Sequence, residues 1–302
     1  MNKRILFATG EGIGNVVQIA PTLRTIKEVL GFDIDLWLAF GSYTIPKDLF
    51  PYVSECYIRQ EIRKMSPMKY YGLVSTFWAQ NHVRYLLEWG MKHVADIYPI
   101  TATSSEVATY MRIARRMGVK EEDIIWEGEC NYTPMDYSYD VVIHNGYNRY
   151  GSADWSIKSY QHYGDVAWAL QDKGYNVASV GSRGEYISGT SNQTGLDLLS
   201  TIGIIKNSKL FLSNDSGLYH CANAVKTDNI VIFTATSIIK NYDSRFHKYS
   251  TIIGRDDLEC RPCQVGRGWK KCDHWGCREI NPQIICDAVM ERLNEYKPTS
   301  NC

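Results

Sequence analysis

The chain has 302 residues, more than one hydrophobic core usually serves, so two domains are expected. With 33 basic and 33 acidic residues the net charge is zero, which excludes a whole-molecule attraction to nucleic acid or anionic lipid. Its 44% hydrophobic and 22% charged residues are typical of a globular protein, and neither a transmembrane run nor a signal peptide is recognisable, so a cytoplasmic location is expected.

Short β-rich runs alternate with helix-like stretches along the chain, and the alternation restarts after the turn-rich segment 131–139. The expected strands are 4–9, 33–40, 140–144, 176–180, 210–213 and 229–234, and the expected helices are 16–30, 156–173 and 196–206. Repeated βαβ units build parallel sheets that bind ligands at the carboxyl ends of their strands. The sequence therefore predicts an α/β fold with two Rossmann-like, doubly wound domains, 1–136 and 137–302, facing a cleft.

A glycine-rich turn, Thr9 to Asn15, follows the first expected strand. Its glycines are Gly10, Gly12 and Gly14, which do not have the G-x-G-x-x-G spacing of a dinucleotide-binding fingerprint. A nicotinamide- or flavin-dependent oxidoreductase is therefore the weakest of the functional alternatives. A plainer interpretation is that the glycines only permit a close strand-to-helix turn.

The turn after the strand 210–213 carries the most informative motif, KLFLSNDSGLYHCANAV. The strand ends in Asn-Asp-Ser-Gly and passes directly into a helix, so the first backbone N–H groups of that helix point at any anion above the strand end. Ser216 adds a hydroxyl, Gly217 permits close approach, and His220 lies one turn further on the same face. The pattern indicates a phosphate site of a nucleotide sugar, or else a simple helix cap by Asp215 or Ser216.

Four of the nine cysteines fall in one segment, as Cys260-x-x-Cys263 followed by Cys272 and Cys277. In a cytosolic chain this clustering favours a thiolate metal site over disulfides, and four thiolates suit tetrahedral zinc or a single iron. The neighbouring cations that would offset the negative charge are Arg261, Arg267, Lys270 and Lys271. The alternative is a set of reduced thiols or one disulfide pair.

Basic and aromatic residues are interleaved between Arg59 and Lys120, where ten Lys or Arg stand against four Asp or Glu. This combination suits an anionic acceptor such as a phosphorylated glycan, or DNA whose bases stack on aromatic rings. A solvated helical face over an aromatic core would give the same pattern.

Four segments together resemble the ADP-heptose heptosyltransferase family of GT-B glycosyltransferases. They are GEGIGNVVQIAPTLRTIK at 10–27, VVIHNGYNRYGSADWSIKSYQHYGDVAWALQDKGYNVASVGSRGE at 141–185, NDSGLYHCANAV at 214–225, and the tail with LECRPC, CDHWGC and INPQIICDAVMERL. The resemblance implies a GT-B fold and transfer of a sugar from a nucleoside diphosphate donor with inversion. It does not extend to about 43–129.

The architecture and the resemblance place the donor mainly on the second half, with its diphosphate at Asp215 to His220 and its ribose hydroxyls at Glu185. The full set of expected donor-binding residues is Gly12, Gly14, Asn145, Gly146, Gly181, Glu185, Asp215, Ser216, Gly217 and His220. N–H and hydroxyl donors there stabilise the leaving diphosphate as it gains charge, so no catalytic metal is required.

The sequence departs from the family at two positions. Where the family has an aspartate as general base, this chain has Asn15, whose amide cannot accept a proton, so Glu11 is the predicted base and Asn15 is assigned to orienting the acceptor. The family's lysine before the loop tryptophan falls near Ala153, and Arg149 or Lys158 is expected to replace it.

The leading hypothesis is an inverting glycosyltransferase that uses an ADP- or UDP-linked sugar, with lipopolysaccharide core or protein as the first acceptors to consider. A glycosyltransferase acting on hydroxymethylated DNA bases is the second. A catalytically inactive nucleotide-sugar-binding protein is the third, because Asn15 replaces the expected base.

Overall fold

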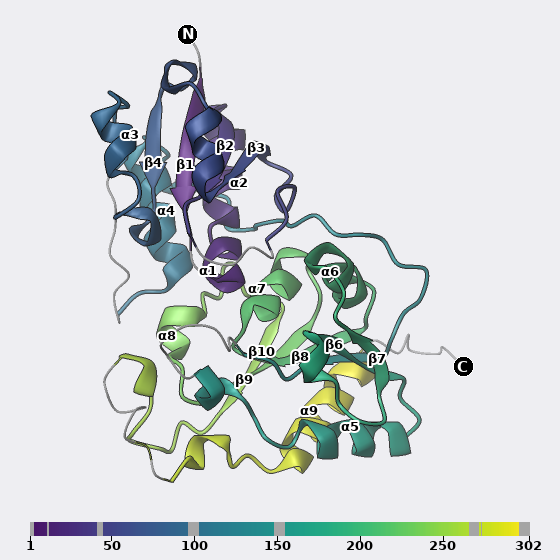
Figure 1. The fold of residues 1–302 in the computed structure, drawn as a ribbon. Helices are drawn as coiled ribbons and strands as arrows, with labels where there is room; N and C mark the ends of the chain where they lie inside the picture. Colours follow the sequence, from purple (N-terminus) through teal and green to yellow (C-terminus); the bar gives the residue numbers. More distant parts are fainter. Residues whose placement is uncertain are drawn as a thin grey trace. The chain divides into compact units, whose positions relative to one another are not determined.

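The computed structural model describes residues 3–10, 12–40, 45–95, 103–147, 155–265, 272 and 274–295. The chain forms two compact units, Met1–Asn131 with Tyr242–Lys248, and Tyr132–Asn241 with Tyr249–Cys302. Each unit contains a parallel sheet accompanied by helices (Figure 1). The predicted α/β class with two Rossmann-like sheets is confirmed.

The first unit is built on a four-stranded sheet of order β3-β2-β1-β4. Its strands are β1 (Arg4–Thr9), β2 (Asp33–Leu38), β3 (Val53–Ile58) and β4 (Gly72–Ser75), and its α-helices are α1 (Ile13–Val17), α2 (Ala20–Leu30), α3 (Arg84–Glu88) and α4 (Glu106–Arg116). The single helix expected at 16–30 is divided, because Pro21 in the first turn of α2 has no N–H to continue the ladder of α1.

The segment Tyr242–Lys248 belongs to the first unit although the chain reaches it from the second. Asp243 accepts a hydrogen bond from the hydroxyl of Ser105, the N-cap of α4, at 2.6 Å. The guanidinium of Arg245 lies 3.4 Å from the ring centroid of Trp126, and Lys248 pairs with Glu127 at 2.5 Å. These contacts tie the segment to residues between Ser105 and Glu127.

The second unit is built on a six-stranded sheet of order β10-β9-β8-β5-β6-β7. Its strands are β5 (Val141–His144), β6 (Val177–Gly181), β7 (Ser191–Thr194), β8 (Leu210–Asn214), β9 (Asn229–Phe233) and β10 (Ser250–Gly254), and its α-helices are α5 (Tyr163–Asp172), α6 (Leu198–Lys206), α7 (Gly217–Ala224), α8 (Ile238–Asn241) and α9 (Pro282–Glu295). Counted within this unit, the strand order is that of the Rossmann fold.

The helix expected at 156–173 is also divided, into a 3₁₀ helix Trp155–Lys158 and α5. Between them the backbone N–H of Tyr160 donates to Asn214 Oδ1 at 3.0 Å, and the Tyr160 hydroxyl donates to the Ile280 carbonyl at 2.8 Å. Since these partners lie outside any helix, they hold the chain in a non-helical path. Lys158 thereby becomes the last residue of a short turn.

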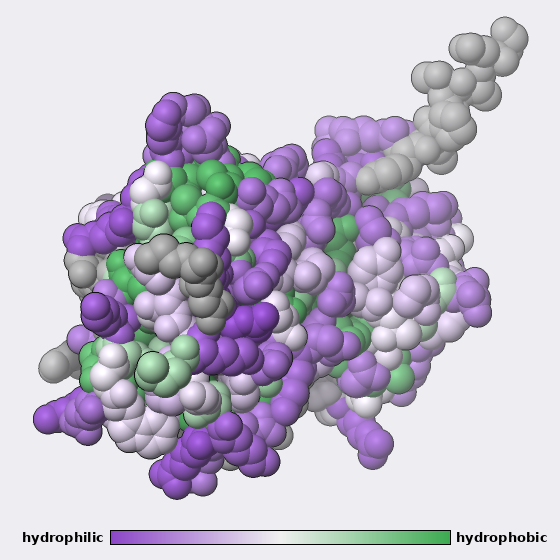
Figure 2. Space-filling view, turned by 90° about the horizontal axis from the view of Figure 1, so that it is seen from above, coloured by the Kyte–Doolittle hydropathy of each residue, from purple (hydrophilic) through white to green (hydrophobic). Residues whose placement is uncertain are grey.

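The core of the second unit consists of buried aliphatic side chains from β5, β8 and β9 packed with α5 and α9, including Val141, Leu212, Ile232, Leu170 and Val289. Hydrophilic residues predominate on the face seen in Figure 2, with hydrophobic ones in separate patches between them. Within the described part of the chain, no helix has the length and apolar character needed to span a membrane.

Candidate functional site

The sheet of the second unit changes winding direction between β5 and β8. From β5 the chain proceeds to β6 and β7 on one side, and from β8 it proceeds to β9 and β10 on the other. The ends of the two strands are aligned, since His144 of β5 is the register partner of Ser213 of β8. Ligands of open α/β sheets bind at the carboxyl ends of the strands at this point, so the residues that follow β5, β6 and β8 form the candidate site.

The turn from β8 into α7 begins with two buried residues, Asn214 and Asp215, and continues with the half-buried Ser216 and Gly217. Asn214 Oδ1 accepts hydrogen bonds from the Tyr160 N–H and the Tyr163 hydroxyl, the latter at 2.9 Å. Ser216 is the N-cap of α7 in extended backbone, and its side chain makes no capping hydrogen bond. All residues of α7 after Gly217 are buried. Ser216 therefore does not cap α7 through its side chain, which agrees with the anion-site interpretation.

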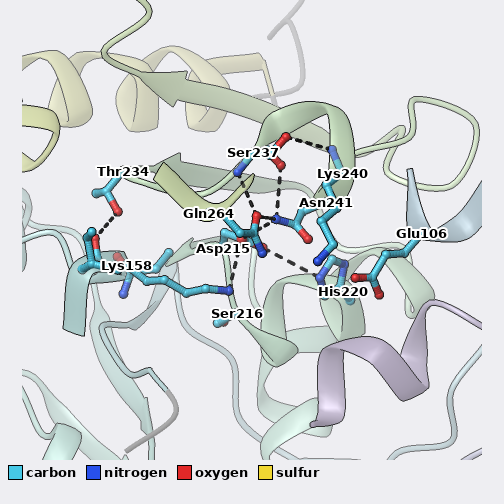
Figure 3. A network of polar contacts seen from close by, with 12 residues as sticks. Glu106, Lys158, Asp215, Ser216, His220, Thr234, Ser237, Lys240, Asn241 and Gln264 are labelled. Carbon is cyan, nitrogen blue, oxygen red and sulfur yellow. Dashed lines mark hydrogen bonds and ion pairs between the residues drawn. The ribbon is translucent and has the colours of Figure 1, made fainter. Parts of the chain in front are cut away.

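Asp215 is the centre of a polar network at this turn (Figure 3). Its carboxylate is buried, and Oδ2 accepts from Lys158 Nζ at 3.3 Å and from Asn241 Nδ2 at 3.1 Å. His220 Nε2 lies 3.9 Å from Oδ1. Burial and the nearby Lys158 charge lower the pKa of His220 to about 3, so this imidazole is neutral at pH 7 and forms no ion pair with Asp215.

Lys158 supplies the cation of the site. Its ammonium lies 5.0 Å from the Trp155 ring centroid, and its side chain is 19% exposed beside the almost fully buried Asp215. Of the two basic residues that the sequence offered as replacements for the family's lysine, Arg149 is outside the described residues. The structure describes Lys158 and places its ammonium beside Asp215, directly after the end of β8.

His144, which the sequence reasoning missed, joins two predicted site residues. Its Nδ1 lies 3.1 Å from Ser216 Oγ and its Nε2 lies 3.4 Å from Glu185 Oε2. Beside an ionised Glu185 the ring proton is favoured on Nε2, so Nδ1 accepts a hydrogen bond from the Ser216 hydroxyl. To donate a hydrogen bond to a phosphate, the Ser216 hydroxyl must therefore give up its hydrogen bond to His144.

Gly146 and Gly181 make room for Glu185. A Cβ on Gly146 would lie 2.3 Å from the Glu185 carboxyl carbon, and a Cβ on Gly181 would lie 2.3 Å from Glu185 Oε2 and 2.9 Å from the His144 ring. Gly181 also has φ +128, which side-chain-bearing residues rarely adopt. The two glycines that were expected to line the site thus leave the space that the Glu185 carboxylate occupies.

Glu185 should give the protein an acid-sensitive component of stability. Burial alone would raise its pKa, but hydrogen bonds from His144 and from the Ser182 N–H, the latter at 2.7 Å, lower the pKa overall. A lowered folded-state pKa stabilises the fold above the unfolded value of about 4.3, and this stabilisation is lost as the pH falls through the folded pKa. In urea unfolding between about pH 7 and 3, the stability advantage of the wild type over Glu185→Gln should therefore shrink with acidification. An advantage that stays constant would contradict the lowered pKa.

Asn145 leaves a polar atom unused at the same edge. Its Oδ1 is buried and has no hydrogen-bond partner among the described residues. A buried acceptor without a partner is costly, and a ligand hydroxyl is one way to satisfy it. Asn145 therefore fits its predicted role in donor binding.

The predicted residues of the first half belong to the first unit. Gly12 is the N-cap of α1, and a Cβ there would meet nothing within 4 Å. Gly14 and Asn15 lie within α1. Glu11, the predicted base, is outside the described residues.

The four clustered cysteines differ in exposure: Cys263 and Cys277 are buried, Cys272 is half-buried and Cys260 is exposed. Burial and the neighbouring thiols Cys263, Cys272 and Cys260 raise the pKa of Cys277 to about 11. However, among the described residues no group of three or more His, Cys, Asp or Glu side chains is placed to hold a metal ion. The predicted four-thiolate centre is thus not preformed.

Comparison with known proteins agrees with this architecture. Residues 150–272 match the model of glycosyltransferase family 9, the heptosyltransferases. This segment is therefore similar to the heptosyltransferases, and the fold of the chain is of the GT-B type. The matched segment contains Lys158, Glu185, Asp215 and His220, and thus most of the candidate site.

Solved structures extend the likeness in fold to nearly the whole chain. The ADP-heptose lipopolysaccharide heptosyltransferase II of E. coli has a TM-score of 0.75 at 16% identity, covering 98% of this chain and 100% of that one. A family 9 glycosyl transferase from Veillonella parvula has a TM-score of 0.74 at 12% identity, covering 97% and 98%. The iron-containing dodecameric glycosyltransferase TibC of enterotoxigenic E. coli has a TM-score of 0.67 at 13% identity, covering 97% and 76%. No curated protein sequence matches the chain significantly.

Proposed function

We propose that this glycosyltransferase moves heptose from an ADP-linked donor to a hydroxyl acceptor with inversion at the anomeric carbon. The observation that carries the proposal is the meeting of Lys158, the α7 N-terminus and the neutral His220 at the switch point of the second sheet. A cation, backbone N–H groups and an uncharged imidazole together suit a diphosphate. ADP-heptose is favoured as the donor because two proteins of similar fold were solved with ADP compounds: TibC with ADP-D-beta-D-heptose, and the E. coli heptosyltransferase WaaC with ADP.

In the proposed reaction the acceptor oxygen forms a bond to the anomeric carbon while the bond from that carbon to the diphosphate oxygen breaks. The electron pair leaves with ADP, whose growing negative charge Lys158 and the α7 N–H groups stabilise. Glu185 and Asn145 are proposed to hold the ribose hydroxyls. The acceptor proton goes to a carboxylate, for which Glu11 stays the prediction from sequence.

A nucleotide panel tests the proposal. ADP and ADP-heptose should raise the melting temperature of the purified protein more than UDP or UDP-sugars, since a ligand that binds only the folded state stabilises it. Mass spectrometry should then detect heptose transferred to a heptose-deficient lipopolysaccharide core or to a protein acceptor. Binding of ADP-heptose with neither transfer nor hydrolysis would support the inactive alternative raised by Asn15. The proposal fails if no nucleoside diphosphate binds.

We further propose that Cys260, Cys263, Cys272 and Cys277 hold a structural zinc or iron. Four thiolates are a donor set for either metal, and TibC, similar in fold, is iron-containing. Arg261 supports the fit, because its buried Nε has no hydrogen-bond partner among the described residues while its charge lowers the pKa of Cys277 against the effect of burial. A bound metal would hold the segment together as a structural crosslink.

Removal of this metal should destabilise the protein. Structural metal sites contribute several kcal/mol to folding, and 1 kcal/mol corresponds to about 2–4 °C for a domain of this size, so chelation should lower Tm by at least about 5 °C. Elemental analysis of the purified protein should find about one zinc or iron per chain. Cys263→Ser, as the control, should lack the metal and be insensitive to chelator. If the purified wild type contains no metal and its Tm does not change with chelator, the proposed site is wrong.

A further inference from the structure

Gln264 follows Cys263 in the segment from Cys260 to Cys277, here called the cysteine segment. Its side chain joins the polar network around Asp215 (Figure 3). Its backbone N–H donates to the Ala235 carbonyl at 3.2 Å. Its side-chain Oε1 accepts from the Ser237 N–H at 2.9 Å and from Asn241 Nδ2 at 2.8 Å. One amide oxygen of the cysteine segment thus fixes the start of α8 and the side chain at its end.

Asn241 passes this constraint to Asp215. The same Nδ2 that donates to Gln264 also donates to Asp215 Oδ2 at 3.1 Å and to the Ser237 carbonyl at 3.1 Å. An amide nitrogen carries two protons, so three acceptors share them, and the shortest contact is the one to Gln264. The orientation of Asn241 therefore depends on Gln264.

Asp215 needs this support when an anion binds. Its buried carboxylate is balanced by Lys158 and Asn241. A diphosphate draws on the same ammonium, so the carboxylate then relies more on the amide, because an under-solvated buried charge is costly. Without Gln264 Oε1, the N–H groups of Ser237 and Asn241 lose their shared acceptor and Asn241 is free to turn from Asp215.

The cysteine segment also supports Lys158 from the other side. Ile157, which precedes Lys158, is buried in one cluster with Ala235, Cys263 and Cys277. Arg278, which follows Cys277, donates from Nε to the Ser159 carbonyl at 2.8 Å. The segment therefore contacts Lys158 through both of its chain neighbours, and it contacts Asp215 through Asn241.

We propose that Gln264 is a positioning residue of the donor site, which sets Asp215 through Asn241 and so couples the cysteine segment to the binding of a nucleoside diphosphate. This inference rests on the proposed function. It assigns the segment a role in ligand affinity in addition to any role in stability.

The test is a double-mutant cycle read out as the Kd for ADP by isothermal titration calorimetry. Gln264→Met keeps the length of the side chain and deletes its oxygen, and it should weaken ADP binding about five- to tenfold, the usual effect of one to two hydrogen bonds. The matched control is Gln171→Met, which removes a side-chain bond to the Gly189 carbonyl in the same unit and should leave Kd unchanged. In an Asn241→Ala background, Gln264→Met should have little further effect, because the relay is already broken.

Failure of the positioning role can be told apart from failure of the proposed function. An unchanged Kd in Gln264→Met, or an effect fully additive with Asn241→Ala, overturns the positioning role while wild-type ADP binding still supports the donor site. Wild type that binds no nucleoside diphosphate overturns the proposed function first. If Gln264→Met does not fold, Gln264→Asn, which withdraws the same oxygen by one methylene, gives the same comparison and should weaken ADP binding at least about threefold.

Discussion

Replacement of Lys158 by alanine should reduce glycosyl transfer by roughly 100- to 1000-fold, the usual effect of removing one group that stabilises charge in a transition state. Its ammonium lies 3.3 Å from the buried Asp215 carboxylate at the end of β8, and it is the cation next to the proposed diphosphate. Because the charge on the leaving ADP grows as the glycosidic bond breaks, the loss should fall mainly on kcat. Steady-state kinetics with ADP-heptose would measure it.

Two companion variants define the reason for the loss. Lys158→Arg keeps the charge with a different donor geometry and should recover only part of the activity. Lys209→Ala removes an exposed lysine of the same unit that pairs with Asp140 at 2.7 Å, and it should leave transfer unaffected. If Lys158→Ala retained more than about a tenth of wild-type kcat, the assignment of the cation to the leaving group would be wrong.

Replacement of Gly181 by alanine should cost about 2–6 kcal/mol of unfolding free energy and abolish tight donor binding. The backbone there has φ +128, and the new Cβ would lie 2.3 Å from Glu185 Oε2 and 2.9 Å from the His144 ring. Positive-φ strain costs on the order of 1–3 kcal/mol, and overpacking of a buried site costs about 1–3 kcal/mol more. Urea unfolding and ADP titration would report the two effects.

Two other glycines of the same unit separate strain from crowding. Gly174 has φ +86 and Gly164 lies in α5 without positive φ, and a Cβ on either would meet nothing within 4 Å. Gly174→Ala should show the strain alone, while Gly164→Ala should be neutral or stabilising by up to about 1 kcal/mol. Equal costs for Gly181→Ala and Gly174→Ala would show that the contact with Glu185 is unimportant.

The sequence was a good guide wherever local pattern decides structure. The turn from 213 to 217 was predicted because an apolar run ending in Asn-Asp-Ser-Gly has few other conformations available to it. β7 was missed, since its residues Ser191–Thr194 are polar and show no strand-like alternation. The two divided helices were missed because periodicity continues across Pro21, which has no N–H for the helix ladder, and across Tyr160, whose N–H donates to Asn214 instead.

The residues that support the site were harder to foresee. His144 ends a buried strand and looked like part of it, and its role follows only once the sheet brings Ser216 and Glu185 to its two nitrogens. Asn241 and Gln264 belong to no motif, and the hydrogen bonds from Asn241 to Asp215 and to Gln264 join three segments far apart in the chain. Such contacts depend on tertiary structure, for which a single sequence carries little signal.

The return of Tyr242–Lys248 to the first unit limits how this protein can be dissected. A fragment ending at Asn131 would keep Ser105, Trp126 and Glu127 but lose Asp243, Arg245 and Lys248, their partners. Each unit is therefore discontinuous in the sequence, and the chain passes from one unit to the other three times rather than once. A first half that folds alone would have to carry residues 242–248 on an added linker.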